Sequence, residues 1–301
     1  MKSTTTVADV LRSSVASATH AFLSAEPHIR STGDPNRIHD ARAAIRRLRS
    51  DLRVFKRFLD PGWAKDLRAE LGWFAQALGA VRDSDVLMVR MDDLSVRLPD
   101  DDREAFDLVL RPLGVARAAA YGRLVATMEG ERYGALRAQI LEASHAPRFT
   151  PRAERTPGAA VYECVRQAWR KLERRVDDLG PNPKDEELHR VRISAKRCRY
   201  AVEAIQPFAK RRARRFLRRV ARLQDILGEL HDVSVERARL RNAMTNDSAA
   251  FVAGELAGLD VVARERARKA WGRAWKKVAN KRLRFWKSHS AFPDGRPTTE
   301  L

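Results

Sequence analysis

Apolar residues recur every three or four positions through most of this chain, which is the spacing of amphipathic helices. In the first half the pattern predicts helices over 7–25, 35–59, 63–78, 83–98, 103–128 and 131–143. The clearest one starts at Pro35 or Asn36 and ends before the helix-breaking pair Pro61-Gly62. Its apolar stripe consists of Ile38, Ala41, Ile45, Leu48, Leu52, Phe55 and Leu59. We therefore expect this helix to be buried along one side.

The order of predicted elements starts again after a segment with three prolines, 145–158, which we interpret as a linker. Helices are predicted over 159–179, 186–205, 210–227, 231–246 and 249–287, followed by a flexible tail over 289–301. The second of these helices repeats the first stripe after 150 residues, with Leu188, Val191, Ala195, Cys198, Val202 and Ile205. We expect one all-α domain over 1–288, made of a first helical bundle at 7–144 and a second at 159–288.

Polar residues repeat at almost the same interval. His39, Arg42, Arg46, Arg47 and Arg49 recur as His189, Arg192, Lys196, Arg197 and Arg199, 150 residues later. Leu78-Gly79 and Asp83 recur after 149 residues as Leu227-Gly228 and Asp232, and Tyr121-Gly122-Arg123 recurs after 150 as Trp271-Gly272-Arg273. Matched blocks in the same order indicate an internal duplication. We expect two four-helix bundles related by a pseudo-two-fold axis.

The repeated basic residues form one line along each helix. In the first copy His39, Arg42, Arg46, Arg49 and Arg53 are spaced 3, 4, 3 and 4 residues apart, which is roughly 21 Å at about 1.5 Å per residue. The second copy has His189, Arg192, Lys196 and Arg199, and Glu203 ends the run. Like charges one turn apart repel by a few tenths of a kcal/mol per pair. The alternative to an anionic partner is a solvated helix face, which does not explain the repetition.

Overall composition strengthens the case for an anionic partner. The 301 residues include 59 Lys and Arg against 39 Asp and Glu, a formal net charge of +20. The densest run lies between Lys210 and Gly228, where eight basic residues accompany one acid, Asp225. Within it Arg211, Arg215, Arg218 and Arg222 share one helix face. The second half therefore predicts the stronger basic surface, and arginine forks pair well with phosphate oxygens.

Other chemistries lack a pattern that would support them. Cys164 and Cys198 form no zinc-ligand set and are interpreted as core side chains. Gly79 and Asp83 are predicted to end one helix and cap the next, as is Asp232, with orientation of a basic neighbour as the alternative role for the two aspartates. No phosphate loop, metal-binding acidic cluster or nucleophile–base set is present in the sequence. We expect no enzyme activity, no cofactor and no metal.

The paired His-x-x-Arg-x-x-x-Lys/Arg-Arg-x-Arg motifs, each followed by Leu-Gly-x-x-Arg/His-Asp, resemble the conserved histidine α-helical domain, the CHAD family. The resemblance extends from about residue 7 to 288 and is closest over 188–203 and 223–232. It implies two pseudo-symmetric bundles around a basic groove or pore that binds inorganic polyphosphate. The matching positions are His39, Arg42, Arg46, Arg47, Arg49, His189, Arg192, Lys196, Arg197, Arg199 and Tyr200. Ser50 stands opposite Tyr200, and Asp40 opposite Arg190.

We therefore predict a non-catalytic polyphosphate-binding protein, with Arg211, Arg215, Arg218 and Arg222 added to the binding set. The sequence leaves two alternatives open. Nucleic acid is one, because basic helices bind any phosphate chain, although few aromatic residues accompany the stripes. A metal-dependent phosphatase or polyphosphatase is the other. A chain with two unclustered cysteines, no signal core and no membrane-spanning segment is expected in the cytoplasm, and the family resemblance adds polyphosphate granules as a location.

Overall fold

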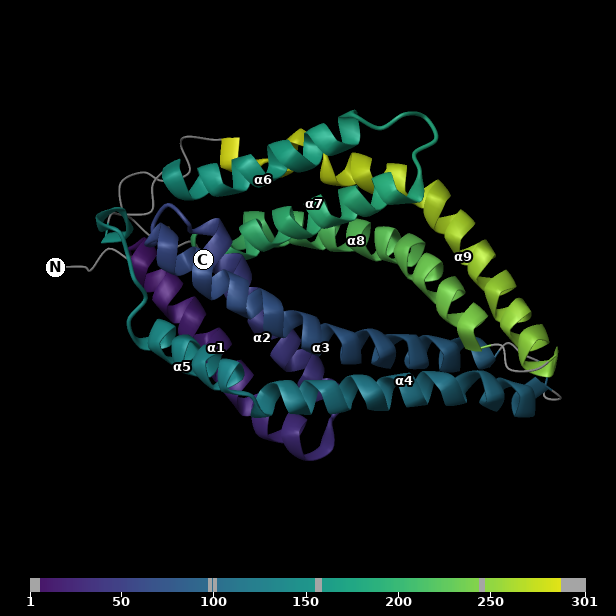
Figure 1. Cartoon of the computed structure of the whole chain (residues 1–301). Coiled ribbons are helices and arrows are strands. Elements are labelled where there is room, and N and C mark those ends of the chain that lie inside the picture. Colours follow the sequence, from purple (N-terminus) through teal and green to yellow (C-terminus); the bar gives the residue numbers. More distant parts are fainter. Residues whose placement is uncertain (1–5, 97–98, 100–101, 155–158, 244–246, 288–301) are drawn as a thin grey trace.

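The computed structural model describes residues 6–96, 99, 102–154, 159–243 and 247–287 (Figure 1). Its long helices are α1 Val7–Thr32, α2 Pro35–Val54, α3 Pro61–Ser95, α4 Arg103–Glu129, α5 Glu131–His145, α6 Ala159–Asp177, α7 Asp185–Ala204, α8 Gln206–Ala243 and α9 Asp247–Val278. Short 3-10 turns are η2 Pro151–Glu154, η3 Lys281–Leu283 and η4 Phe285–Lys287. These ranges contain no strand beyond an isolated bridge between Leu59 and Phe149. The all-α prediction is confirmed.

The start of α2, which carries the first basic stripe, is set by local signals. Gly33 ends α1 in the left-handed conformation at φ 61°, and its N–H bonds the Ile29 carbonyl. Asp34 then caps α2, its carboxylate accepting from the Asn36 N–H at 2.8 Å. Pro35 is at the first helical position, where a missing N–H costs nothing. The predicted start at Pro35 is therefore confirmed.

Several predicted helix ends are wrong. α1 continues through Pro27 to Thr32, because Glu26 and Ile29 on either side of the proline are buried. α3 runs without a break through Gly79 and Asp83, so neither residue ends or caps a helix. α8 likewise continues through Gly228 and position 232, and the predicted cap at Asp232 is also wrong. α2 ends at Val54, earlier than predicted, although Phe55 and Leu59 remain in the core.

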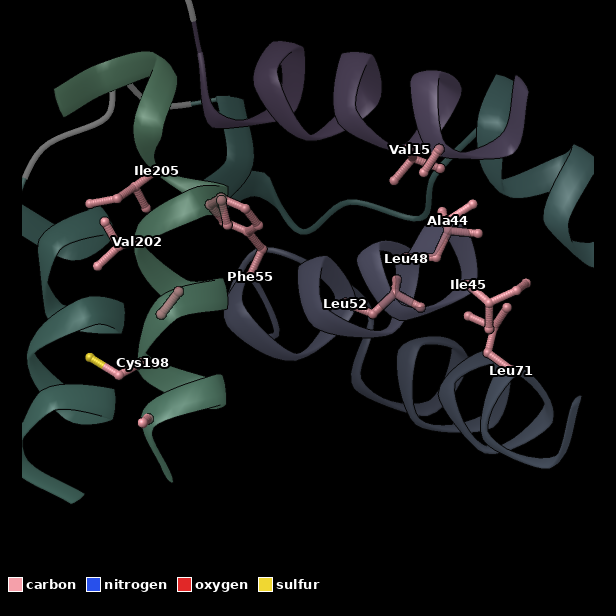
Figure 2. Close-up of a cluster of buried hydrophobic side chains, with 14 of the residues drawn as sticks. Val15, Ala44, Ile45, Leu48, Leu52, Phe55, Leu71, Cys198, Val202 and Ile205 are labelled. Atoms are coloured by element: carbon pink, nitrogen blue, oxygen red, sulfur yellow. The ribbon is translucent and has the colours of Figure 1, made fainter. Parts of the chain in front are cut away.

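One hydrophobic core includes residues from both halves of the chain. All the apolar stripe positions predicted for α2 and α7 are buried. Figure 2 shows Phe55, at the end of α2, pointing toward Val202 and Ile205 at the end of α7. α2 and α7 pack against each other, and each boundary of α7 lies 150 residues after that of α2. The arrangement as two bundles about a two-fold axis stays a prediction.

The hairpins α3–α4 and α8–α9 are long and antiparallel, and Figure 1 shows them converging at the end distant from α2 and α7. There α4 packs against α9, and a small second core is formed by Leu87, Met91, Phe106, Val109, Leu113 and Val252. Arg90 of α3 also forms an ion pair with Glu229 of α8 at 3.5 Å. α3 and α8 are therefore held opposite each other at this end, while α2 and α7 join the halves at the other. The predicted tail at 289–301 lies outside the described residues.

Candidate functional site

The first basic stripe lies against the backbone of α3. The Arg42 Nη1 is 3.4 Å from the Asp83 carboxylate, so Asp83 has the alternative role of orienting a basic neighbour. A β-carbon added at Gly79 would be only 2.7 Å from Arg42 Nη1, and one added at Gly72 would be 3.1 Å from Arg49 Nη2. The Arg42 guanidinium therefore occupies the space that a side chain at position 79 would fill, and the Arg49 guanidinium lies tightly against position 72.

Arginines from three helices gather beyond this contact, and we call Arg49, Arg53, Arg68 and Arg197 the arginine cluster. Burial and the charge of Arg68 lower the pKa of Arg49, whose Nε–H is buried without a hydrogen-bond partner. Burial and the charges of Arg68, Arg197 and Arg49 lower the pKa of Arg53. Among the described residues, no carboxylate forms an ion pair with any of the four. Within the part of the chain that the structure describes, the cluster is therefore a concentration of positive charge without a carboxylate counter-ion.

A contact between α2 and α7 extends this surface. The Arg46 guanidinium lies over the ring of Tyr200 at 5.8 Å from its centre, a cation–π arrangement. The residue opposite Tyr200 in the first copy, Ser50, is buried. The two basic helices are thus joined through a basic residue of one and an aromatic residue of the other.

In the second stripe, the last basic residue has partners within the second half. His189, Arg192 and Lys196 are half-buried on α7. Burial and the charges of Arg192 and Lys196 lower the pKa of His189. Arg199 donates to Glu203 at 2.6 Å and to Gln224 at 3.2 Å. Arg199, the counterpart of Arg49, is therefore already neutralised by a carboxylate.

The α8 arginines predicted to share a face, Arg211, Arg215, Arg218 and Arg222, are all exposed. Helical periodicity places Glu229 on the same face. Because Glu229 pairs with Arg90 of α3, this face of α8 turns toward α3 at that level. The α8 arginines therefore provide a further exposed basic surface, on the helix face that Glu229 shares.

Arg47 and His39, both predicted to bind phosphate, have surroundings that differ from those of the other predicted residues. Arg47 lies on the α1 side of α2, where its Nε donates to Ser14 at 3.1 Å and to Asp51 at 3.0 Å. Asp51 is fully buried, so Arg47 serves as its counter-ion. The His39 side chain is exposed to solvent over much of its surface. Desolvation of its covered part, together with the charges of Arg82 and Arg46, lowers its pKa.

Sequence reasoning missed the contribution of α3. Along this helix, Arg68, Gly72, Gly79 and Asp83 follow one another at intervals of 4, 7 and 4 residues. Helical periodicity puts these positions on one line. That spacing is the signal that could have identified α3 as the support for Arg42 and Arg49.

The described residues also contain a groove that is separate from the arginine cluster. A groove of about 930 Å³ between α1 and α2 is lined mainly by serine and alanine, and it does not include the arginine cluster. No group of three His, Cys, Asp or Glu residues that could hold a metal ion occurs in the described ranges. In the same ranges, no helix combines the length and apolar character needed to cross a membrane.

A family model described as the CHAD domain matches residues 13–241. The chain belongs to the CHAD domain family. This match is shorter than the resemblance read from the sequence, which ran from about 7 to 288, and it includes both stripes and most of α8.

Two curated relatives, both uncharacterized proteins from Mycobacterium tuberculosis strains, are 30% identical to the chain over 220 residues. The alignment covers 67% of this chain and 39% of each relative, so the match accounts for about two-fifths of their length.

Two solved structures share the fold. PptA from Streptomyces chartreusis has a TM-score of 0.73 at 22% identity, covering 90% of this chain and 100% of that one. The CHAD domain from the plant Ricinus communis has a TM-score of 0.70 at 21% identity, covering 93% and 94%. These similarities establish the all-helical CHAD fold for this chain.

Proposed function

We propose that the protein binds inorganic polyphosphate through the arginine cluster and the two basic stripes. The observation that carries the proposal is the convergence of Arg49, Arg53, Arg68 and Arg197 from three helices without a carboxylate partner among the described residues. Membership of the CHAD family, which is linked to polyphosphate binding, supports the same ligand.

The electrostatics of the cluster favour a ligand with many closely spaced negative charges. Each arginine added to the cluster raises the positive potential at the others, which is why the pKa of Arg53 is lowered by its neighbours as well as by burial. A phosphate chain removes this repulsion and accepts paired hydrogen bonds from the planar guanidinium groups.

Nucleic acid is the second phosphate chain that a basic surface can bind, but the environment of the stripes favours polyphosphate. Arg42 and Arg49 are packed against α3, and Tyr200 is half-buried beneath Arg46. Base stacking needs accessible aromatic faces. We propose binding without hydrolysis, because the cluster consists of guanidinium groups, which provide neither a nucleophile nor a general base.

Titration with long-chain polyphosphate, duplex DNA and single-stranded RNA at matched phosphate concentration and near-physiological salt tests the proposal. We expect polyphosphate to bind most tightly, with an affinity that falls steeply as salt rises. Arg49→Ala with Arg53→Ala should weaken binding by roughly 10- to 100-fold, since two charge-assisted contacts are lost. The control, Arg174→Ala with Arg175→Ala, removes two exposed charges from the end of α6.

The control should reduce affinity much less, and circular dichroism should show both variants folded. Equal affinity for duplex DNA and polyphosphate would contradict the choice of ligand. Release of phosphate in the same samples with Mg²⁺ or Mn²⁺, surviving further purification, would contradict binding without hydrolysis.

A further inference from the structure

We propose that Gly72 and Gly79 of α3 are positioning residues for polyphosphate binding, because they leave the space in which the Arg49 and Arg42 guanidinium groups lie against the helix. This inference rests on the proposed function. The two glycines touch no ligand themselves, and they act through the arginines that they position.

Both glycines are in the interior of a 35-residue helix, where glycine is unfavourable. In such a position it costs about 1 kcal/mol relative to alanine. Alanine at Gly79 would bring its β-carbon to 2.7 Å from Arg42 Nη1, closer than stable contacts allow. Elsewhere, glycines such as Gly114 of α4 have nothing within 4 Å of an added β-carbon. Gly72 and Gly79 therefore differ from Gly114, because an arginine side chain lies next to the place where their β-carbon would be.

The spacing of the two contacts indicates that they form one matched set. Arg42 and Arg49 are seven residues apart on α2, and Gly79 and Gly72 are seven apart in the opposite direction on α3. Seven residues are about two turns of helix, or 10.5 Å. The antiparallel pairing of α2 with α3 thus brings both arginines onto glycines at once.

The identity of the contacting atoms determines whether the arginine side chain or the helix backbone moves when a glycine is replaced. The atoms closest to the added β-carbons belong to the ends of long arginine side chains, not to backbone. Alanine should therefore displace the guanidinium groups and leave the helices packed. At Arg42 the Asp83 carboxylate, 3.4 Å away, also orients the group. At Arg49 no described carboxylate does so, and its position depends more on Gly72.

The second half uses a different arrangement for the equivalent arginine. At the interval of 149 residues that relates Gly79 to Gly228, the counterpart of Gly72 is Ala221. Arg199, the counterpart of Arg49, is instead held by Glu203 and Gln224. Among the described residues, Arg49 is therefore positioned by a glycine contact, whereas Arg199 is positioned by side-chain partners.

The test measures polyphosphate affinity and melting temperature for Gly79→Ala, Gly72→Ala and the control Gly114→Ala. Freeing a positioned side chain costs about 0.5–1.5 kcal/mol on binding, so we expect each α3 variant to bind roughly two- to tenfold more weakly. Gly114→Ala should bind like the wild type. All three variants should keep full helicity, and Gly114→Ala should melt at a higher temperature, since alanine is the better helix former.

A double-mutant cycle separates positioning from a general effect on the fold. In an Arg42→Ala background, Gly79→Ala should cause no further loss of affinity, because no guanidinium group is left to displace. An equal loss in both backgrounds would overturn the inference, as would wild-type affinity in Gly79→Ala itself. A crystal structure of Gly79→Ala with Arg42 unmoved would overturn it independently of any ligand. Failure of the wild type to bind polyphosphate would instead contradict the proposed function.

Discussion

At the scale of single residues, this protein keeps titratable groups where positive charge opposes their protonation. His39 and His189 each begin a basic stripe, and both have a pKa lowered from the ordinary value of 6.5. Burial is the largest cause for each, followed by Arg82 and Arg46 for His39 and by Arg192 and Lys196 for His189, while Asp40 opposes the shift at His39. Both histidines are therefore mainly neutral at pH 7 in the free protein.

Binding of polyphosphate should raise the pKa of both histidines, because the ligand cancels the nearby positive charge. We expect affinity to increase as the pH falls from 7.5 to 5.5, with protons taken up on binding. Without ligand the fold should become less stable over the same range, since the unfolded chain, with its pKa of about 6.5, gains protons before the folded one. Calorimetry in buffers of different ionisation enthalpy counts these protons.

The matched variant for this effect is His39→Gln with His189→Gln, which should flatten the pH dependence of affinity between pH 7.5 and pH 5.5. The polyphosphate and every other titratable group stay the same in this comparison. An affinity that rises equally toward pH 5.5 in the variant and the wild type would assign the proton uptake elsewhere.

At the scale of helices, charge counting and contacts lead to different expectations for α2 and α7. The sequence predicts that the second half dominates binding, because α8 adds its arginine run to the stripe of α7. The contacts show that Arg199 of α7 is already paired with Glu203, whereas Arg49 of α2 has no ion pair among the described residues. An arginine with an internal counter-ion offers less to a ligand than one without.

We therefore expect Arg49→Ala to weaken polyphosphate binding more than Arg199→Ala, by about three- to tenfold in the ratio of dissociation constants. Each substitution removes one charge and leaves the buried apolar stripe of its helix intact. Isothermal titration of the two variants under one salt condition makes the comparison. A larger loss for Arg199→Ala would restore the prediction from charge counting and place the dominant contacts on α7 and α8.

At the scale of the whole molecule, the two halves share one core, and their stabilities should be coupled. The main hydrophobic cluster contains residues from α1 through α9, and Phe55 is completely buried where α2 packs on α7. Truncating a buried phenylalanine removes apolar contacts and leaves a cavity. The repeat seen in the sequence therefore does not imply two independently stable bodies.

Phe55→Ala should lower the free energy of unfolding by about 3–5 kcal/mol and shift a single cooperative transition. Phe251→Ala is the matched control, because that phenylalanine is 61% exposed on α9, and it should change stability by less than about 0.5 kcal/mol. Differential scanning calorimetry distinguishes the outcomes. Two resolved transitions, with only one displaced by Phe55→Ala, would contradict a shared core.

The sequence alone determined the features that depend on helical period. Each stripe residue predicted to be inward and lying within α2 or α7 is buried, from Ile38 to Leu52 and from Leu188 to Val202. The line from His39 to Arg53 also follows from spacing within one helix. These properties are local, since the 3.6-residue period sets which side chains share a face whatever the helix packs against.

Only the tertiary structure decided which basic residues have partners. Gly79 was interpreted as a helix end because glycine commonly ends helices, but it is in the middle of α3, where Arg42 needs the space. Arg68 becomes part of the arginine cluster only because the fold brings it near Arg49, Arg53 and Arg197, which lie on other helices. Such contacts depend on the register and closeness with which helices pack, and these are properties of pairs of helices that no single segment contains.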